Sequence, residues 1–429
     1  MRLAIIGAGW VGVVTATVLA DLGHDVVCTD VNPDRIAQLS AGVAPFVEPG
    51  LEELLTRALS SGRLRFTGDN AEAMGRAQVV FCCVNTPTGA DGATDLQAVM
   101  TVAEDFARYH LSGAVFVIKS TVPAGTAAQV RNLITELTPD IAERSFTVAS
   151  NPEFLAESTA IRDTLTPSRI VIGASEPETL QIVSEVYAPI VANGAPVFTC
   201  DCATAEVIKT AANSYLATRI SFINEIANYC QVVGADPMAV AIGLGFDPRI
   251  GALRPGVGYG GGCFPKDVKA LLHEGELAGV SLSVLAATNA ANYQQRELFF
   301  GKLSAALGDL SGKKIAILGL AFKPKTDDTR DAPALTLIGQ LRSAGAEVVV
   351  YDPVVKSGSV REFPDLIFAD TAMDAAEHVD ALVCMCEWEE FKQLDLVALK
   401  NVMRGNVLAD GRYVWSKSAA VQAGFTYLA

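Results

Sequence analysis

The stretch Gly7-Ala8-Gly9-Trp10-Val11-Gly12 separates a short apolar run, Arg2 to Ile6, from an apolar segment that continues to about Leu22. A second apolar run, Asp25 to Thr29, follows and leads directly to Asp30. The order strand, glycine-rich turn, helix, strand begins a doubly wound α/β sheet, and the pattern G-x-G-x-x-G lets a pyrophosphate approach the helix N-terminus. This stretch therefore predicts a dinucleotide-binding Rossmann domain at the start of the chain.

The residues around this turn predict which dinucleotide binds. Asp30 lies near the spacing at which a carboxylate accepts a hydrogen bond from the ribose 2′-hydroxyl, and its charge would repel a 2′-phosphate. We therefore expect NAD rather than NADP. Arg35 has two interpretations, one along the adenosine and one facing solvent from the next helix. The predicted cofactor contacts in the turn are Gly7, Gly9, Trp10, Val11 and Gly12.

Three further apolar runs, Val79 to Val84, Val115 to Lys119 and Phe146 to Ala149, are typical of parallel strands buried on both faces. Polar loops follow each run, at the carboxyl ends of strands where open α/β sheets bind ligands. Thr86 and Thr121 lie in two of these loops and either contact the cofactor or cap a turn.

The loop Asn151-Pro152-Glu153-Phe154-Leu155-Ala156-Glu157 follows the third of these runs. Glu153 and Glu157 bring two carboxylates to this edge of the sheet, where they can orient or activate a water molecule.

Residues Thr204 to Gly234 contain almost no helix breaker, which predicts one long helix with Thr204 near its N-cap. Lys209 and Asn213 lie four residues apart and therefore on one face of it. They are either solvated polar positions or groups that stabilise a reacting oxygen. The apolar stripe of the helix can also form a homodimer interface.

A second α/β pattern begins after the polar stretch Ser311 to Lys314. Strands are expected at Ile315 to Leu318, Val348 to Tyr351 and Val407 to Asp410, and a helix at Ala334 to Ser343. The first turn of this pattern, residues 319–325, lacks G-x-G-x-x-G and instead offers Phe322, Lys323 and Lys325 to a base and phosphates. The predicted domains are residues 1–200, 201–310 and 311–429.

The stretch Gly258-Tyr259-Gly260-Gly261-Gly262-Cys263-Phe264-Pro265-Lys266-Asp267 contains four glycines, a cysteine and a Lys-Asp pair. Glycines permit close approach of another molecule to Cys263. A thiol reacts as its thiolate, and Lys266 with the N-terminus of a following helix would favour that form. The alternative is a buried structural cysteine in a glycine-rich turn.

Composition excludes several classes of protein. The 429 residues carry a formal net charge of -15, which argues against non-specific binding to nucleic acid or to anionic membranes. The chain opens on a strand and contains no apolar run of transmembrane length, so we expect a cytoplasmic protein with reduced cysteines. No C-x-x-C pair occurs and the four histidines are scattered, so no metal site is predicted.

The motifs GAGWVG, VNTPT, STVP, NPEFLAE, RPGVGYGGGCFPKD, LGLAFKPKTDDTR and DGR, with the Lys209/Asn213 helix, occur in the order of the UDP-glucose/GDP-mannose dehydrogenase family. The chain resembles this family over nearly its whole length. The resemblance implies two Rossmann-like domains joined by a long central helix, with NAD on the first domain. It is greatest to the members that oxidise UDP-glucose to UDP-glucuronate by four electrons. GDP-mannose and UDP-N-acetyl hexosamines are the alternative substrates.

The resemblance also implies roles for individual residues. Cys263 is the nucleophile that forms a thiohemiacetal and then a thioester, and Glu153 is the base for hydrolysis of the thioester. The remaining catalytic candidates are Lys209, Asn213, Asp267 and Thr121. Candidate cofactor contacts beyond the first turn are Asp30, Arg35, Thr86, Thr121, Glu157, Lys266 and Arg330. Candidate substrate contacts are Glu153, Phe154, Leu155, Lys209, Asn213, Arg254, Tyr259, Gly260, Phe264, Phe322, Lys323 and Arg412.

One residue departs from the family pattern. Gly262 precedes the cysteine where many members carry serine and the UDP-N-acetylmannosamine branch carries histidine, which disfavours that branch. Two other classes of function fit parts of the sequence. A two-electron hydroxyacid dehydrogenase would leave Cys263 without a role, and a non-catalytic NAD-binding regulator would not need a reactive thiol.

Overall fold

The computed structural model describes residues 1–89, 91–138 and 144–429. The chain divides into two compact units, Met1–Ala212 and Asn213–Ala429. The expected division at residues 200 and 310 stays a prediction.

The first unit is built on an eight-stranded sheet with the order β3-β2-β1-β4-β5-β6-β7-β8. All described neighbours pair in parallel except β6 and β7, which are antiparallel. The strands are β1 (Arg2–Ile6), β2 (Asp25–Thr29), β3 (Leu64–Thr67), β4 (Val79–Cys82), β5 (Ala114–Ile118), β6 (Phe146–Ser150), β7 (Ile170–Ala174) and β8 (Val197–Cys200). The expected strands of this domain are confirmed to within two residues, and Asp25–Thr29 is confirmed at both ends.

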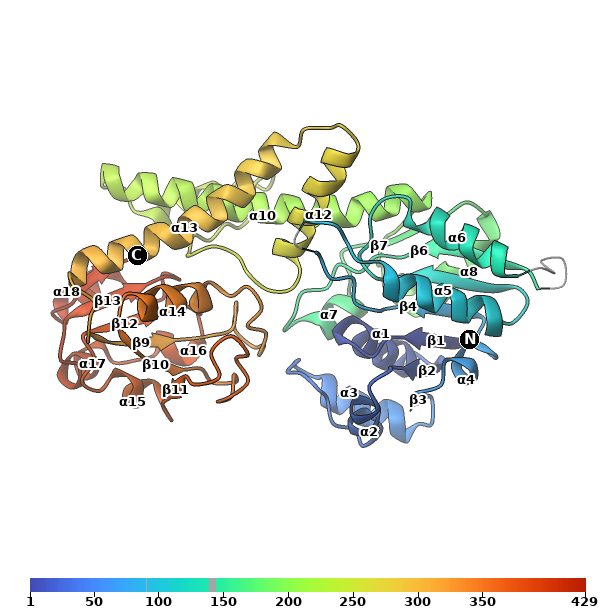
Figure 1. The fold of residues 1–429 in the computed structure, drawn as a ribbon, viewed down its shortest axis with the longest axis horizontal. Helices are drawn as coiled ribbons and strands as arrows, with labels where there is room; N and C mark the ends of the chain where they lie inside the picture. Colours follow the sequence, from blue (N-terminus) through green and yellow to red (C-terminus); the bar gives the residue numbers. More distant parts are fainter. Residues whose placement is uncertain (90, 139–143) are drawn as a thin grey trace. The chain divides into compact units, whose positions relative to one another are not determined.

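Helices cover both faces of this sheet (Figure 1). Along β1, Leu3 and Ile5 pack into one core with residues of α1, while Ala4 and Ile6 pack into a second core with residues of α5 and α6. This alternation follows the two-residue period of a strand and explains why the whole run is apolar. The helices are α1 (Trp10–Asp21), α2 (Pro33–Ser40), α3 (Leu51–Ser60), α4 (Asn70–Met74), α5 (Gln97–Tyr109), α6 (Thr126–Leu137), α7 (Ala160–Leu165), α8 (Pro177–Val186) and α9 (Ala188–Ala192).

The second unit contains a six-stranded sheet with the order β11-β10-β9-β12-β13-β14, in which the described pairs are all parallel. The strands are β9 (Lys314–Leu318), β10 (Glu347–Tyr351), β11 (Ile367–Phe368), β12 (Ala381–Cys384), β13 (Val407–Asp410) and β14 (Thr426–Leu428). The helices around them are α14 (Pro333–Ser343), α15 (Ala372–Ala376), α16 (Glu389–Lys392), α17 (Leu396–Val402) and α18 (Lys417–Gln422). The expected second Rossmann-like sheet is confirmed.

The expected central helix is α10 (Cys202–Val233), 32 residues long, and the boundary between the two units falls within it. It begins two residues before Thr204. Thr204 therefore lies in the first turn, near the helix start as expected, and the carboxylate of Asp201 accepts hydrogen bonds from the amide and hydroxyl of Thr204, both at 2.8 Å.

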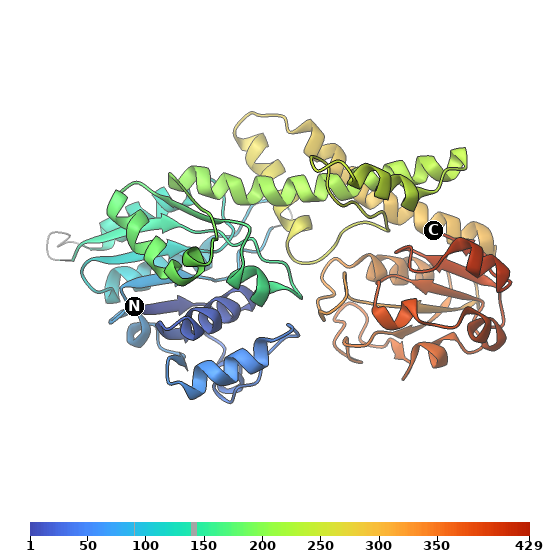
Figure 2. The same ribbon diagram turned by 180° about the vertical axis from the view of Figure 1, so that it is seen from behind.

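Three more helices of the second unit accompany α10: α11 (Pro237–Gly245), α12 (Phe264–Leu277) and α13 (Ser283–Leu307). Helix α13 runs beside the C-terminal half of α10 (Figure 2). The hydroxyl of Ser221 donates to the carbonyl of Thr288 at 2.9 Å, and Asn228 donates to Gln295 at 2.6 Å. Polar contacts thus fix the two helices along their length.

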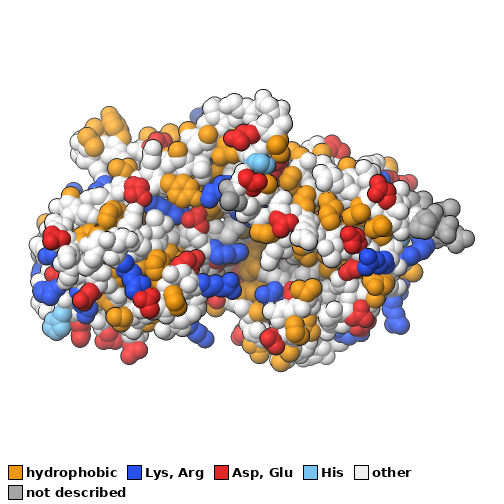
Figure 3. Space-filling view, viewed as in Figure 1, with side chains coloured by type: hydrophobic (Ala, Val, Ile, Leu, Met, Phe, Trp, Pro, Cys, Tyr) orange, Lys and Arg blue, Asp and Glu red, His pale blue; other side chains and the backbone are white. Residues whose placement is uncertain are grey.

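The surface mixes charges of both signs. On the face seen in Figure 3, acidic and basic side chains are interspersed over each unit. Within residues 1–89, 91–138 and 144–429, none of the helices combines the length and the apolar composition required to cross a membrane.

Candidate active site

The glycine-rich turn after β1 has the backbone of a nucleotide cradle. Gly7 has φ +101°, and a Cβ on it would lie 2.8 Å from the carbonyl oxygen of Cys83. A Cβ on Gly12 would lie 1.8 Å from the carbonyl oxygen of Gly7. Helix α1 is capped by Gly9, which has no side chain to occupy the amides of the first turn. These features fit the pyrophosphate of NAD.

Asp30 closes the same turn from the end of β2. Its carboxylate accepts hydrogen bonds from the amides of Ala8 and Asn32, each at 2.9 Å. Arg35 pairs with it at 3.2 Å, and the Asp30 side chain is 9% exposed. Arg35 therefore contacts Asp30, the residue that is predicted to bind the ribose.

Thr86 and Thr121 join two neighbouring loops. The hydroxyl of Thr86 donates to the carbonyl oxygen of Thr121 at 2.7 Å. The loops after β4 and β5 are also joined by Ser120, whose hydroxyl donates to the carbonyl of Val84 at 2.7 Å. Thr86 thus ties these loops together, and whether it also contacts a cofactor stays a prediction.

Glu153 and Lys209 form a buried ion pair in the first unit. The Nζ atom of Lys209 lies 2.9 Å from Oε1 of Glu153, and both side chains are less than a tenth exposed. The amide of Leu155 donates to the other carboxylate oxygen at 2.5 Å. Burial alone would raise the pKa of Glu153, but the charges of Lys209 and Lys119 and these hydrogen bonds together lower it. Glu153 is therefore ionised at neutral pH and can accept a proton.

The rest of the loop after β6 packs tightly. Glu157 is buried, and the ring of Phe154 is covered by the guanidinium of Arg169, with 3.6 Å between the Arg169 carbon and the ring centroid. Lys209 lies on the same ring, 5.6 Å from its centroid. The ring of Phe154 therefore interacts with two cations.

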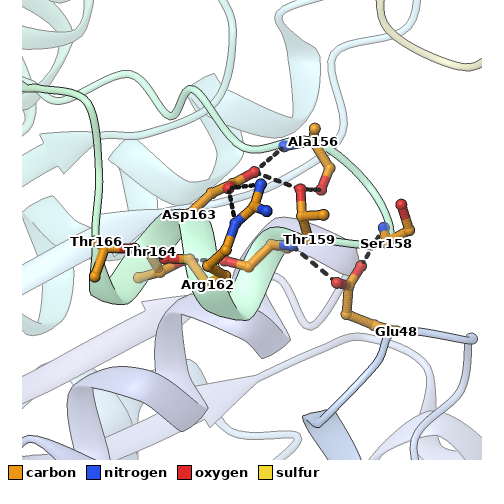
Figure 4. Close-up of polar contacts among 9 residues, drawn as sticks. Glu48, Ala156, Ser158, Thr159, Arg162, Asp163, Thr164 and Thr166 are labelled. Carbon is orange, nitrogen blue, oxygen red and sulfur yellow. Dashed lines mark hydrogen bonds and ion pairs between the residues drawn. The ribbon is translucent and has the colours of Figure 1, made fainter.

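The end of this loop is held by a residue that the sequence did not reveal, Glu48. Its carboxylate accepts hydrogen bonds from the amides of Ser158 and Ala160, each at 2.8 Å, and from the indole of Trp10 at 3.2 Å. Figure 4 shows Glu48 reaching the start of α7 from a separate segment. A glutamate just before Pro49-Gly50 gave no signal, because its partners are 38 to 112 residues away in sequence.

Cys263 lies at the N-terminus of α12 in the second unit and serves as its N-cap residue. It is exposed, whereas the other eight cysteines are buried or half-buried, and no disulfide joins any of the nine. A helix N-terminus stabilises negative charge, which favours the thiolate.

The glycines before Cys263 make room for two side chains of the second unit. A Cβ on Gly261 would lie 2.9 Å from the ring of Phe322, and a Cβ on Gly262 would lie 2.3 Å from the guanidinium carbon of Arg330. Arg330 is also bound by both carboxylate oxygens of Asp328, at 2.8 and 2.7 Å. Because Gly262 has no side chain, the guanidinium of Arg330, held by Asp328, can pack directly against the backbone next to Cys263.

Asp267 lies one turn into α12 and is 1% exposed. Asn213 donates to its Oδ2 atom at 2.6 Å. The Nζ atom of Lys266 forms an ion pair with Oδ1 at 2.7 Å, and among the described residues Oδ1 accepts no hydrogen bond, so it retains acceptor capacity. Asn213, Lys266 and Asp267 are thus brought together next to the helix start that carries Cys263.

The predicted substrate contacts of the second unit also gather. Arg412 donates to the carbonyls of Phe322, Gly258 and Met385 at 3.0 to 3.3 Å. Arg254 donates to the carbonyl of Arg412 at 3.1 Å. The Nζ atom of Lys323 lies 5.3 Å from the ring centroid of Phe322. The rings of Tyr259 and Phe264 meet edge to face, with 6.1 Å between their centroids. A Cβ on Gly260 would lie 2.4 Å from the carbonyl oxygen of Asp331.

Helix α13 supplies two buried residues that the sequence did not reveal as part of the site. Asn292 accepts a hydrogen bond from the amide of Tyr259 at 2.8 Å, and Arg296 donates to the carbonyl of Tyr259 at 2.7 Å. Both side chains are less than 5% exposed. They fix the loop that precedes Cys263. No signal in the sequence pointed to them, because polar residues on this face hide the apolar periodicity of the helix.

Comparisons with known proteins cover the whole chain. Residues 1–191, 203–294 and 316–417 match the NAD binding, central and UDP binding domains of the UDP-glucose/GDP-mannose dehydrogenase family. UDP-glucose 6-dehydrogenases of Pseudomonas aeruginosa and Rhizobium meliloti are 41% and 42% identical to it, over 100% of this chain and 96% and 98% of theirs. The structure of a UDP-glucose dehydrogenase from Pyrobaculum islandicum matches with a TM-score of 0.92 at 36% identity, covering 100% of this chain and 96% of that one.

Proposed function

The chain belongs to the UDP-glucose/GDP-mannose dehydrogenase family and is an NAD-dependent oxidoreductase, and on this basis we propose that it oxidises UDP-glucose to UDP-glucuronate. The two full-length relatives named UDP-glucose 6-dehydrogenase support this substrate. Oxidation of a primary alcohol to a carboxylate removes four electrons. NAD, when bound, would supply the hydride acceptor, and two equivalents would be needed for each sugar.

The observation that carries the proposal is an exposed cysteine at a helix N-terminus, beside a buried carboxylate. After the first oxidation, the sulfur of Cys263 adds to the aldehyde carbon and the oxygen takes up a proton, which gives a thiohemiacetal. Loss of a hydride and a proton from this adduct gives a thioester. Water then attacks the thioester carbon, the carbon–sulfur bond breaks, and the products are the carboxylate and the thiol.

Charged and amide groups of the chain assist these steps. Glu153, ionised at neutral pH, accepts the proton of the attacking water. Lys209 and Asn213, one turn apart on α10, donate hydrogen bonds to the oxygen on which negative charge develops, at about 3 kcal/mol for each donor. Asp267 keeps an acceptor oxygen for the substrate hydroxyl or the water.

The nucleotide is assigned to the second unit. Residues 316–417 match a UDP binding domain, and Phe322, Lys323 and Arg412 lie in it. An aromatic ring and cations suit a base and a pyrophosphate. Arg330 is proposed to contact the cofactor.

The assembly is proposed to be a homodimer through α10. This helix exposes large apolar side chains, among them Tyr215 at 61%, Tyr229 at 64% and Val232 at 86%. Exposed apolar stripes of this kind mark protein interfaces. A cytoplasmic location fits the nine cysteines without disulfides, because Cys263 must stay reduced to react.

The test counts reduced cofactor. Purified protein is incubated with NAD and a known amount of UDP-glucose, GDP-mannose or UDP-N-acetylmannosamine, and absorbance is followed to completion. Two NADH for each UDP-glucose, with none in Cys263→Ser, is the expected result. One NADH for each sugar would overturn the thioester mechanism, and two NADH from another sugar alone would correct the substrate.

A further inference from the structure

A cavity of about 330 Å³ lies in the first unit, beneath the loop that carries Glu153. Its walls come from Thr15 and Leu19 of α1, from residues 162–170 after and within α7, and from Lys119, Asn151 and Tyr187. Lys209 does not line it. A separate hollow of about 10 Å³ is lined by Thr121, Glu206 and Lys209, and Pro152 contributes to the walls of both. The cavity is therefore distinct from the hollow that Lys209 lines.

Lys119 brings a buried positive charge to this cavity. It is 7% exposed, and its Nζ atom has only neutral partners: both oxygens of Asn151, at 3.4 and 3.2 Å, and the hydroxyl of Tyr187, at 3.4 Å. These contacts are longer than a charged donor forms with a good acceptor. Lys119 can therefore accommodate a stronger acceptor from the cavity side.

Arg169 brings a second positive charge. Its guanidinium lies on the ring of Phe154 and donates one hydrogen bond, to the hydroxyl of Ser168 at 2.9 Å. Burial lowers the pKa of Arg169, as expected for a cation with reduced hydration and no acidic neighbour. Among the residues that the structure describes, neither Lys119 nor Arg169 has a carboxylate within ion-pair distance.

The carboxylates in the wall are already bound by other groups. Asp163 pairs with Arg162 and accepts from the hydroxyl of Thr159 at 2.7 Å and the amide of Ala156 at 3.2 Å (Figure 4). Glu153 is bonded to Lys209 and to the amide of Leu155, although the charge of Lys119 also acts on it. The wall thus carries three positive and two negative side chains, and its two cations without a carboxylate partner, Lys119 and Arg169, stand out in a chain whose net charge is -15.

We propose that this cavity binds a small phosphate-bearing anion. A guanidinium binds two phosphate oxygens at once and an ammonium acts as a point charge beside it. The hydroxyls of Ser168 and Tyr187 supply neutral contacts in the same wall. The volume lies at the lower end of small-molecule sites, which fits a sugar phosphate rather than a nucleotide sugar.

Binding would act on the loop after β6. Arg169 covers Phe154, and Lys119 contacts Asn151, so an anion that draws both cations changes how residues 151–155 are held. Glu153 lies in this stretch. The effect on turnover rests on the role proposed for Glu153, whereas binding itself does not.

The probes are inorganic phosphate and glucose 1-phosphate, with binding followed by calorimetry on the full chain in saturating UDP-glucose, which occupies the nucleotide-sugar site. Arg169→Gln and Lys119→Met are expected to weaken binding at least tenfold, and Arg169→Lys to retain part of it. Arg131→Gln is the matched control, because Arg131 pairs with Glu176 in the same unit at 2.7 Å and does not line the cavity.

Hydrogen exchange locates the site. Protection of residues 151–170 by glucose 1-phosphate, lost in Arg169→Gln, is the expected result. Binding of glucose 1-phosphate but not of inorganic phosphate supports a sugar phosphate as the ligand. The proposal is overturned if neither probe binds, if Arg169→Gln binds as the unmodified chain does, or if UDP-glucose abolishes all binding.

Discussion

The turns after β1 and after β9 share one backbone plan. Each begins with a glycine at positive φ, Gly7 at 101° and Gly319 at 89°. The amide of each glycine donates to the last carbonyl of the neighbouring strand, Thr29 in the first sheet and Tyr351 in the second, both at 2.8 Å. The backbone therefore leaves β1 and β9 through the same kind of turn.

An aspartate follows the second strand of each sheet. Asp30 accepts from the amide of Ala8 at 2.9 Å, and Asp352 from the amide of Leu320 at 2.8 Å. Asp352 accepts from three more amides, those of Ala321, Val354 and Val355. Asp30 has one further amide donor and Arg35. Asp30 therefore keeps acceptor capacity for a ribose hydroxyl, whereas backbone amides occupy the carboxylate of Asp352.

The two turns differ most in the length of chain between each turn and its helix. Helix α1 begins at Trp10, directly after the turn, whereas α14 begins only at Pro333. Residues 320–332 occupy the interval and carry Phe322 and Arg330 toward the glycines before Cys263. The same strand-turn plan thus serves a dinucleotide where the helix starts at once and supports the cysteine loop where it does not.

The largest effect is expected from breaking the first turn. In Gly12→Ala, the new methyl group would collide with the carbonyl of Gly7, so NAD affinity should fall at least a thousandfold, about 4 kcal/mol. Titration with NAD measures the loss, and retained UDP-glucose binding shows that the second unit is folded. Gly9→Ala, whose Cβ meets only Asn85 at 3.9 Å, should lose much less. Unchanged NAD affinity in Gly12→Ala would contradict the assignment of the cradle.

The corresponding change in the second turn should affect stability instead of NAD binding. A Cβ on Gly319 would lie 2.3 Å from the Cβ of Cys386, so Gly319→Ala should cost about 3 kcal/mol of unfolding free energy in the second unit. Hydrogen exchange of β9 measures it. Gly312→Ala, also at positive φ but with open space around it, should cost only about 1 kcal/mol. A loss of NAD affinity in Gly319→Ala would argue that the two turns do not act separately.

Replacing each aspartate by asparagine should show that Asp30 acts on cofactor preference and Asp352 on stability. Asp30→Asn removes the charge that repels a 2′-phosphate, so the preference for NAD over NADP should fall about tenfold to a hundredfold, roughly 1.4 to 2.8 kcal/mol. Asp352→Asn should leave the preference unchanged and cost about 1 to 3 kcal/mol of stability through weakened buried hydrogen bonds. Affinities for both cofactors are measured for each variant. Equal shifts in both would show that cofactor choice does not depend on Asp30.

The smallest effect concerns pH. The pKa of Glu153 is lowered in the folded first unit, so the unfolded chain binds more protons in the acid range and the stability from this group is lost as pH falls through the folded pKa. The pKa of Asp410, in the second unit, is shifted in the opposite direction, because burial raises it. The contribution of Asp410 to stability therefore falls as pH rises above about 4. Denaturant titrations of Glu153→Gln should show a flatter acid-side slope. A slope as steep as that of the unmodified chain would contradict the lowered pKa.

The sequence predicted the strands better than the helices around the site. Runs such as Asp25 to Thr29 are apolar because both faces of the strand are buried, which leaves a continuous signal. Helix α13 was not predicted, because its buried face carries Thr288, Asn292, Gln295 and Arg296. The antiparallel pairing of β6 with β7 had no signal, since pairing direction depends on the path of the chain between the strands.

Residue types at the candidate site were readable, but their pairing was not. Glu153 and Lys209 were both candidates, yet their ion pair joins residues 56 positions apart. The same holds for Asn213 and Asp267, 54 positions apart. Glycine spacing predicted a close approach to Cys263, whereas the approaching groups, Phe322 and Arg330, come from a distant loop.

The contact between Gly262 and Arg330 has an evolutionary consequence. Because a Cβ at position 262 would overlap the guanidinium of Arg330, any residue other than glycine there requires this side chain to shift. Homologous chains with serine or histidine before the cysteine should have moved or shortened the residue that corresponds to Arg330, or lost its bidentate bond to Asp328. Paired substitution at these positions would then distinguish branches of the family better than either residue alone.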